Sequence, residues 1–151
     1  MAEGQAAKKS AGSGEIASAE PVWRQWQAGL QEASRTGRPI LVDVYTDWCG
    51  WCRRMDRDTY AQAPIRDYLG GHYVTVKLNP EQSSELRAVA NRFRVSGYPT
   101  TIFLRSNGDH LLTVPGYIPD KDFLPVLRYV AEGHMERGVE FETFRKQLDG
   151  H

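Results

Sequence analysis

Residues 40–52 read Ile-Leu-Val-Asp-Val-Tyr-Thr-Asp-Trp-Cys-Gly-Trp-Cys, and the rest of the chain is interpreted around them. The run over residues 39–45 is rich in β-branched and aromatic residues with little polar alternation, which predicts a central parallel strand buried on both faces. A charged, helix-favouring stretch follows Cys52. Cys49 therefore lies at a predicted strand-to-helix junction, where the helix dipole and unsatisfied N–H groups favour a thiolate.

The chain has 151 residues, 40% of them hydrophobic, with 19 basic and 19 acidic side chains. This supports one sizeable core, so we expect a single domain over residues 21–151 after a flexible, small and polar leader over residues 1–20. The charges are balanced and the arginines are scattered, so the sequence has no basic cluster of the kind that binds nucleic acid or an anionic membrane. No apolar run reaches the roughly 20 residues of a membrane span, and the N-terminus lacks the apolar core of a secretory signal.

The segments on either side of the cysteine motif have helical patterns. A helix is expected over residues 21–37, where apolar side chains recur at helical spacing, proline suits the first turn and glycine closes the end. After the cysteines, residues 53–60 favour a helix, and Pro64 forces a break. A further helical segment over residues 65–69 is expected to end at the glycine pair, residues 70–71.

The second half of the chain predicts more strands. Residues 72–78 alternate as a strand, and the segment before them is long enough for a right-handed crossover that makes this strand parallel to the first. A helix with one apolar stripe is expected over residues 86–93. Residues 100–104 and 111–114 flank Asn107-Gly108, which is typical of a hairpin, so an antiparallel pair joins the sheet.

The C-terminal part predicts helices. Residues 123–130 have a helical apolar stripe, in which Pro125 is expected near the start of the helix or at a kink. The tail, residues 134–151, can form a short appended helix and carries no chemistry. The order of elements therefore predicts an α/β fold with a central mixed β-sheet flanked by helices.

Cys49 and Cys52 are the only cysteines in the chain, and their spacing fits a redox dithiol, half of a zinc or iron–sulfur site, or a local crosslink. A structural zinc site needs four ligands, and no histidine stands in ligand spacing, so a metal would require a second subunit. The histidines in question are His72, His110, His134 and His151. A crosslink over so short a loop removes little chain entropy. The redox dithiol is therefore favoured.

Asp43 is the acidic exception inside the predicted buried strand. Burying a carboxylate costs free energy unless the group is paired or protonated. Aspartate is seldom found in a core merely as a hydrogen-bonded polar residue. Desolvation is expected to raise the pKa of Asp43, which makes this residue a candidate proton acceptor for Cys52.

A second motif, Gly97-Tyr98-Pro99-Thr100, lies at the start of the predicted hairpin. The spacing of residues does not decide whether the peptide bond before Pro99 is trans or cis. Together with residues 42–52 and Gly116, this motif resembles the thioredoxin family, and within it the bacterial thioredoxin-related branch that includes the C-terminal domain of the periplasmic thiol-disulfide interchange reductase. The resemblance covers about residues 22–131 and implies a thioredoxin fold.

The resemblance also implies roles for individual residues. Cys49 is expected to be the nucleophile, Cys52 the resolving thiol and Asp43 the family's buried acid. Pro99 matches the family's cis-proline, which packs against the disulfide. The expected substrate-binding residues are Trp48 beside the nucleophile, Gly50, Trp51, Tyr98 with its backbone hydrogen bonds, and Pro99, while Asp47 matches an acidic position outside the core.

Two positions depart from the family pattern. Gly50-Trp51 stands where the commonest family reductant has Gly-Pro, and because Trp51 has a backbone N–H, the redox potential stays open. Trp51 is equally compatible with packing against a neighbouring loop and with substrate contact. Tyr98 replaces a smaller aliphatic residue, which narrows or redirects the substrate groove. The other aromatic residues on apolar stripes are expected in the core, namely Trp23, Trp26, Phe93 and Phe123.

We therefore expect a protein thiol-disulfide oxidoreductase that acts as a reductase through the Cys49/Cys52 dithiol. A disulfide oxidase of the same fold is the alternative within this class, and a non-catalytic binding or metal-bridging module is the alternative outside it. No cofactor is needed, because the chemistry resides in sulfur. The expected partners are a disulfide-bonded protein substrate and an external electron donor, either a membrane reductant carrier or a soluble reductase. We expect a monomer, periplasmic or otherwise exported on the resemblance alone, with a cytoplasmic location as the alternative.

Overall fold

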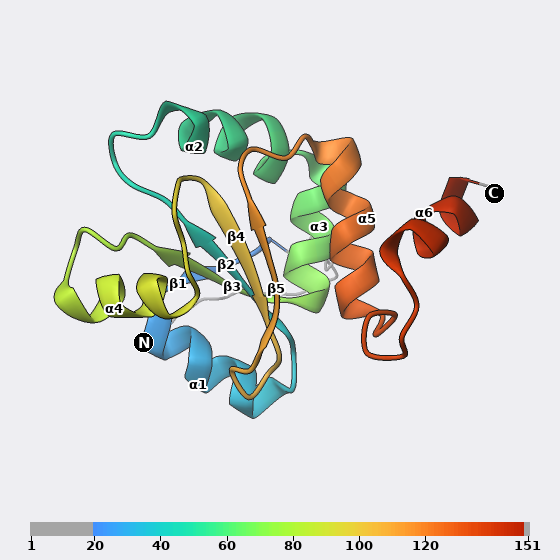
Figure 1. Ribbon diagram of the computed structural model, residues 1–151, viewed down its shortest axis with the longest axis horizontal. Coiled ribbons are helices and arrows are strands. Elements are labelled where there is room, and N and C mark those ends of the chain that lie inside the picture. The colour runs from blue at the N-terminus through green and yellow to red at the C-terminus, as the bar shows by residue number, and fades with distance from the viewer. Residues whose placement is uncertain (1–19, 150–151) are drawn as a thin grey trace.

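A computed structural model describes residues 20–149, which form a mixed five-stranded sheet in the order β1-β3-β2-β4-β5 (Figure 1). Strands β1, β3 and β2 run parallel, whereas β4 is antiparallel to β2 and β5 is antiparallel to β4. The strands are β1 (Trp23–Arg24), β2 (Ile40–Val44), β3 (Val74–Leu78), β4 (Thr100–Leu104) and β5 (His110–Pro115). The leader expected over residues 1–20 lies outside the described residues, apart from Glu20.

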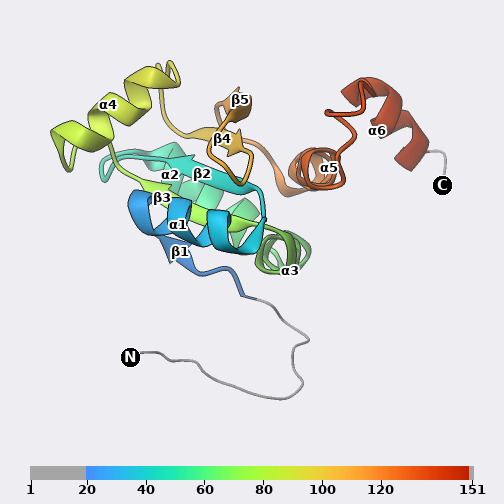
Figure 2. The ribbon, with the colours of Figure 1, turned by 90° about the horizontal axis from the view of Figure 1, so that it is seen from below.

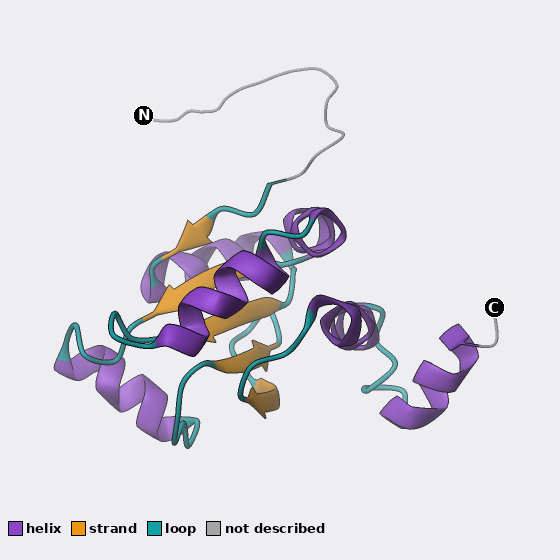
Figure 3. Cartoon of the chain, turned by 90° about the horizontal axis from the view of Figure 1, so that it is seen from above, coloured by secondary structure: helices purple, strands orange, loops and turns teal. Residues whose placement is uncertain are grey.

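Helices cover both faces of the sheet (Figures 2 and 3). They are α1 (Trp26–Thr36), α2 (Gly50–Met55) with a π-helical continuation η2 (Asp56–Tyr60), α3 (Ala63–His72), α4 (Ser84–Arg92), α5 (Asp120–Ala131) and α6 (Phe141–Asp149). Helices α1 and α4 supply the core on one face, while α2, η2, α3 and α5 supply it on the other. The predicted α/β class and mixed sheet are confirmed. Within residues 20–149, no helix has the length and apolar character needed to cross a membrane.

Strand β2 is the centre of the sheet, as predicted, and every one of its residues is buried. Successive side chains of a strand point to opposite faces. Ile40, Val42 and Val44 join the core under α1 and α4, and Leu41 joins the core under α3 and α5. Because Asp43 lies two residues after Leu41, its carboxylate lies on the same face of the sheet as Leu41, which α2 and η2 also cover.

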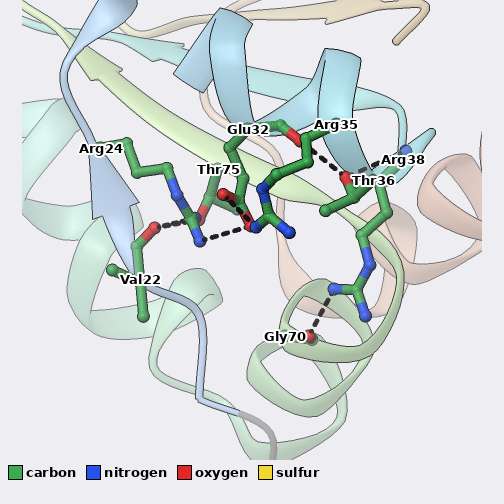
Figure 4. A network of polar contacts seen from close by, with 8 residues as sticks. All are labelled: Val22, Arg24, Glu32, Arg35, Thr36, Arg38, Gly70 and Thr75. Atoms are coloured by element: carbon green, nitrogen blue, oxygen red, sulfur yellow. Dashed lines mark hydrogen bonds and ion pairs between the residues drawn. The ribbon is translucent and has the colours of Figure 1, made fainter. Parts of the chain in front are cut away.

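The predicted start of the first helix was wrong. Strand β1 lies before the helix and pairs with β3, and α1 begins only at Trp26. A two-residue strand is too short for periodicity to reveal. Polar contacts attach it to its neighbours, since Thr75 donates a hydrogen bond to the Val22 carbonyl over 3.0 Å and Arg24 lies 3.7 Å from Glu32 (Figure 4). The predicted end was right, because Gly37 caps α1 with a φ of 77°.

The predicted end of the next helical segment was also wrong. Helix α3 continues through the glycine pair to His72. Glycine weakens a helix by about 1 kcal/mol relative to alanine, but tertiary packing overrides that preference. Leu69 and Tyr73 are buried on either side of the pair, and Arg38 donates a hydrogen bond to the Gly70 carbonyl over 3.1 Å (Figure 4). Pro64 lies in the first turn of α3, where its missing N–H costs no hydrogen bond.

Strand β3 begins at Val74, later than expected, because residue 72 still belongs to α3. Helix α4 and strands β4 and β5 lie where the sequence predicts them. The hairpin turns at Gly108, which has a φ of 95°.

Helix α5 begins at Asp120, earlier than expected, so Pro125 lies inside the helix rather than near its start. The tail does form a helix, α6, which follows α5 in the chain (Figure 1). Phe144 of α6 is buried, and its ring centroid lies 5.8 Å from that of Tyr129 in α5.

Candidate active site

Helix α2 follows β2 after a short loop (Figure 1), and the cysteine pair lies at the start of this helix. Cys49 is the N-cap residue, and its Sγ accepts a hydrogen bond from the backbone N–H of Cys52 over 3.1 Å. The two sulfurs form a disulfide bond, and both residues are buried. An N–H group and a helix N-terminus stabilise negative charge. The site therefore favours a thiolate on Cys49 when the pair is reduced.

Asp43 belongs to a polar row that crosses three strands behind the cysteine helix. In the sheet register, Asp43 is opposite Lys77 of β3 on one side and Thr101 of β4 on the other. The Lys77 Nζ donates a hydrogen bond to the Asp43 Oδ2 over 2.7 Å. The expected buried acid is therefore present, but it has a cationic partner that lies 34 residues further along the chain.

The charges in this row change the proton affinities of both partners. Burial raises the pKa of Asp43, and the charge of Lys77 opposes that rise without cancelling it. Burial by itself lowers the pKa of Lys77, but the carboxylates of Asp43 and Asp56 outweigh burial and raise it. Lys77 thus stays protonated, while Asp43 accepts a proton at a higher pH than an ordinary aspartate does.

Three aromatic rings surround the Lys77 ammonium group. Its Nζ lies 5.2 Å from the Trp23 ring centroid, 5.0 Å from that of Tyr45 and 5.9 Å from that of Tyr60. Cation–π attraction at these distances helps to hold a charged amine away from bulk water. Trp23 thus lies in strand β1 beside Lys77, and not on the helical stripe to which the sequence pattern assigned it.

Trp48 stands exposed beside the disulfide and is held from two sides. Its side chain is 65% exposed, and its Nε1 donates a hydrogen bond to the Glu81 carboxylate over 3.0 Å. Its ring lies edge-on to Tyr98, with the centroids 6.0 Å apart. No local pattern indicates Glu81, because its partner Trp48 lies 33 residues earlier in the chain. Trp48 thus joins the cysteine loop to the loop of the second motif.

The peptide bond between Tyr98 and Pro99 is cis, as the resemblance implied. The backbone N–H of Gly116 donates a hydrogen bond to the Pro99 carbonyl over 2.8 Å, which ties this loop to the end of β5. Gly116 has a φ of 93°, a conformation that favours glycine. The three segments that carried the resemblance therefore meet at one end of the sheet.

Trp51 packs against a neighbouring loop and remains accessible. Its ring centroid lies 5.4 Å from that of Tyr117, and the Arg54 guanidinium lies 5.1 Å from the Trp51 centroid. The Trp51 side chain is nevertheless 55% exposed. The packing interpretation is thus observed, and substrate contact stays a prediction. Gly50 between the cysteines is also exposed.

Asp47 and two of the histidines singled out from the sequence contact residues other than the cysteines. Asp47 is exposed, and its backbone carbonyl accepts a hydrogen bond from Arg53 over 2.9 Å. His72 contacts Tyr68, and His110 contacts Thr113. In the part of the chain that the structure describes, no group of three or more His, Cys, Asp or Glu side chains is arranged to hold a metal ion.

Comparisons with known proteins agree with this geometry. A family model described as a thioredoxin-like domain matches residues 26–131. The thiol:disulfide interchange protein DsbD of Ralstonia nicotianae is 33% identical over 100 residues, which are 66% of this chain and 16% of that protein. A thioredoxin from Thermus thermophilus has the same fold, with a TM-score of 0.71 at 24% identity over 79% of this chain and 93% of that one.

A domain structure from the DsbD group is also similar. The C-terminal domain of DsbD from Neisseria meningitidis, solved in its reduced form, gives a TM-score of 0.55 at 21% identity over 68% of this chain and 94% of that one. At this identity the likeness concerns the fold. The present chain spans less than a fifth of the length of the curated DsbD relatives that it matches.

Proposed function

The chain belongs to the thioredoxin-like family, and from that premise we propose that it is a thiol-disulfide oxidoreductase that reduces disulfide bonds in proteins. The observation that carries the proposal is the position of Cys49, whose Sγ caps α2 and accepts the Cys52 N–H over 3.1 Å. The printed name of the DsbD relatives, thiol:disulfide interchange protein, supports the same chemistry.

The first step uses the reduced protein. The Cys49 thiolate attacks one sulfur of a substrate disulfide in line with the S–S bond. A new bond joins Cys49 to that sulfur, the substrate S–S bond breaks, and the other substrate sulfur leaves as a thiolate that takes a proton from water. The product is a mixed disulfide between Cys49 and the substrate.

The second step uses Cys52. Asp43 accepts the Cys52 proton, and the resulting thiolate attacks the Cys49 sulfur and displaces the remaining substrate sulfur as a thiolate. Two electrons have then passed to the substrate, and Cys49 and Cys52 are left as the disulfide found in the structure. Burial supports this role of Asp43, because it raises the proton affinity of the carboxylate.

Reduction is the direction that we favour over oxidation. A base such as Asp43, which accepts the proton of the resolving thiol Cys52, assists the release of a reduced substrate. A strong oxidase instead stabilises the nucleophilic thiolate further, often through a histidine between the cysteines, and here Gly50-Trp51 occupies that place.

The exposed surface beside the disulfide supports a protein as substrate. Trp48 and Trp51 flank Cys49 and are 65% and 55% exposed, and Tyr98-Pro99 lies next to Trp48. Exposed aromatic side chains of this kind favour contact with a polypeptide. We extend the proposal to Trp48, Gly50, Trp51, Tyr98 and Pro99 as the substrate-binding residues.

Turnover needs an external electron donor, because the disulfide must be reduced again. We propose a dithiol donor, either a membrane reductant carrier or a soluble reductase, and a periplasmic or otherwise exported place of action, in keeping with the DsbD relatives. The site described uses residues of one chain, so we propose a monomer. Light scattering and fractionation of cells that express the full gene test these two points.

Reduction of insulin by the fully reduced protein tests the proposed activity. We expect stoichiometric reduction in a single turnover by the wild-type protein and none by the Cys49→Ser variant. A wild-type protein that leaves insulin oxidised, and whose Cys49 is alkylated no faster than a free cysteine across the pH range, contradicts the proposal. Stoichiometric zinc or iron in protein purified without added metal favours the metal-bridging alternative.

A further inference from the structure

One ammonium group stands between two carboxylates behind the cysteine helix. The Lys77 Nζ lies 2.7 Å from the Asp43 Oδ2 and 2.8 Å from the Asp56 Oδ1. The two acids differ in their surroundings, since the side chain of Asp43 is 3% exposed and that of Asp56 is 47% exposed. Lys77 therefore pairs with one buried acid and one acid that water reaches.

Asp56 reaches Lys77 from the same continuous helical segment that carries the cysteines. It begins the π-helical turn η2, in which the Ala61 N–H donates a hydrogen bond to the Asp56 carbonyl over 3.1 Å. Residues four apart lie on one side of a helix, so Asp56 follows Cys52 on the side that faces the sheet. Single π-helical turns occur frequently at functional sites.

Water reaches this ion pair from the edge of the sheet, through a pocket of about 450 Å³. Asp56, Lys77 and Tyr60 line it, together with Trp23 and Arg66. A solvated carboxylate keeps its negative charge at little cost, whereas a buried one does not. Asp56 is thus positioned to offset the charge of Lys77 without being buried itself.

We propose that Asp56 is a positioning residue that shares the Lys77 ammonium with Asp43, so that the buried carboxylate is not neutralised by Lys77 alone and can take the proton of Cys52. The inference rests on the proposed function for the identity of the proton donor. The electrostatic link between Asp56 and Asp43 stands on the ion-pair geometry alone.

The charges around Asp43 act in a definite direction. Lys77 stabilises the Asp43 carboxylate, and the negative charge of Asp56 cancels part of that effect. Burial is the main cause of the raised pKa of Asp43, and Asp56 pushes it the same way. Removing the charge of Asp56 leaves Lys77 to act on Asp43 unopposed, so the pKa of Asp43 falls.

The other groups that face Asp43 do not supply this effect. Tyr60 of η2 stays neutral, because burial raises its pKa well above the usual range. Thr101 of β4 is uncharged. Cys49 and Cys52 of the α2 segment do not titrate while they form the disulfide. Beyond Asp56, the charge of Arg66 is paired with Glu20 at 3.3 Å.

The test is the pH titration of the Asp43 carboxyl carbon by NMR in the oxidised protein. Both carboxylates contact one nitrogen and so lie within about 6 Å of each other, where a neighbouring charge shifts a titration midpoint by about one pH unit or more. We expect the midpoint to fall by about that amount in Asp56→Asn and to stay at the wild-type value in Asp56→Glu.

Asp58→Asn is the matched control, because Asp58 lies on the same turn but pairs with Arg54 and Arg57 instead of Lys77. An unchanged midpoint in Asp56→Asn, or an equal fall in Asp58→Asn, overturns the proposal. The titration uses the oxidised protein and needs no catalysis. A wild-type protein that fails to reduce insulin therefore refutes the proposed function, while this titration still decides the link between the two acids.

The same variants give a kinetic readout in the reduced protein. If Asp43 takes the Cys52 proton, its lower basicity in Asp56→Asn slows the resolution of a preformed mixed disulfide at neutral pH by about tenfold, and the acid limb of that rate moves to lower pH. A purely structural role of Asp56 changes the unfolding free energy but leaves this limb in place.

Discussion

The sulfur of Cys49 and the backbone N–H of Cys52 are joined by a 3.1 Å hydrogen bond across the first turn of α2. The residue that supplies the donor is also the residue whose sulfur closes the disulfide. A single helical turn therefore stabilises the charge on one sulfur and holds the second sulfur within bonding distance of it. This asymmetry favours Cys49 as the nucleophile and Cys52 as the resolving thiol, although the two side chains are chemically identical.

The first prediction concerns that division of work. Replacement Cys52→Ser keeps the attacking thiol but removes the resolving one, so the mixed disulfide with a substrate protein accumulates. Mass spectrometry of the alkylated, non-reduced mixture measures it. Cys49→Ser is the control and is expected to form little adduct. Equal trapping by the two variants contradicts the assignment of Cys49 as the nucleophile.

The second prediction concerns stability and pH. Burial raises the pKa of Asp43 above its ordinary value of 3.8, so the folded protein binds this proton more tightly than the unfolded chain does. The stabilisation that comes from this tighter proton binding is fully present below pH 3.8. It is lost as the pH rises through the pKa that Asp43 has in the folded protein. The Asp43→Asn variant has no carboxyl group at this position and does not lose this stabilisation. Its unfolding free energy should therefore rise relative to that of the wild type as the pH increases from acid to neutral.

Urea denaturation of both proteins at several pH values measures this difference. Glu32→Gln is a control, because the pKa of Glu32 is lowered through its hydrogen bond to Arg35 and its linkage has the opposite sign. A difference between Asp43→Asn and the wild type that is constant with pH is incompatible with a raised pKa for Asp43.

The third prediction concerns Trp51. Its replacement by alanine removes an exposed ring that packs beside Tyr117 and Arg54. If this ring contacts substrate, KM for a protein substrate rises by about tenfold, which corresponds to about 1.4 kcal/mol, while the rate with a small disulfide is unchanged. Val22→Ala, at an exposed apolar side chain on the β1 edge, is the control. Unchanged KM in Trp51→Ala leaves packing as the role of Trp51.

The fourth prediction concerns the appended helix. Phe144 is buried against α5, so Phe144→Ala is expected to lower the unfolding free energy by about 3–5 kcal/mol. Lys146→Ala on the exposed side of α6 is expected to change it by less than about 0.5 kcal/mol. Chemical denaturation measures both. Equal stability of the two variants contradicts a structural role for α6, and neither substitution is expected to alter disulfide exchange by folded protein.

The structure could be predicted from the sequence wherever a local pattern of residues is compatible with only one local structure. The run before the cysteines, apolar except for Asp43, predicted a buried central strand, Gly108 marked the hairpin, and Gly37 marked a helix end. The acid inside the apolar run was recognisable as a buried group because aspartate is rare there. These features depend on neighbours in the chain.

The features that were missed depend on register and packing between distant segments. Lys77 becomes the partner of Asp43 only once β3 is aligned with β2, and Asp56 reaches it only through a π-helical turn. Strand β1 is two residues long and exists because β3 offers an unpaired edge. Glu81 holds Trp48 across a loop. Periodicity in a single sequence carries no signal for such pairs.

The redox potential of the Cys49–Cys52 couple tests the central claim, that this dithiol reduces protein disulfides. Equilibration of the protein with glutathione buffers, followed by alkylation and mass spectrometry, measures it directly. We expect a reducing couple, more negative than about −200 mV, toward the range of thioredoxins near about −270 mV. A value less negative than about −200 mV, toward the strong oxidases near about −120 mV, contradicts the claim.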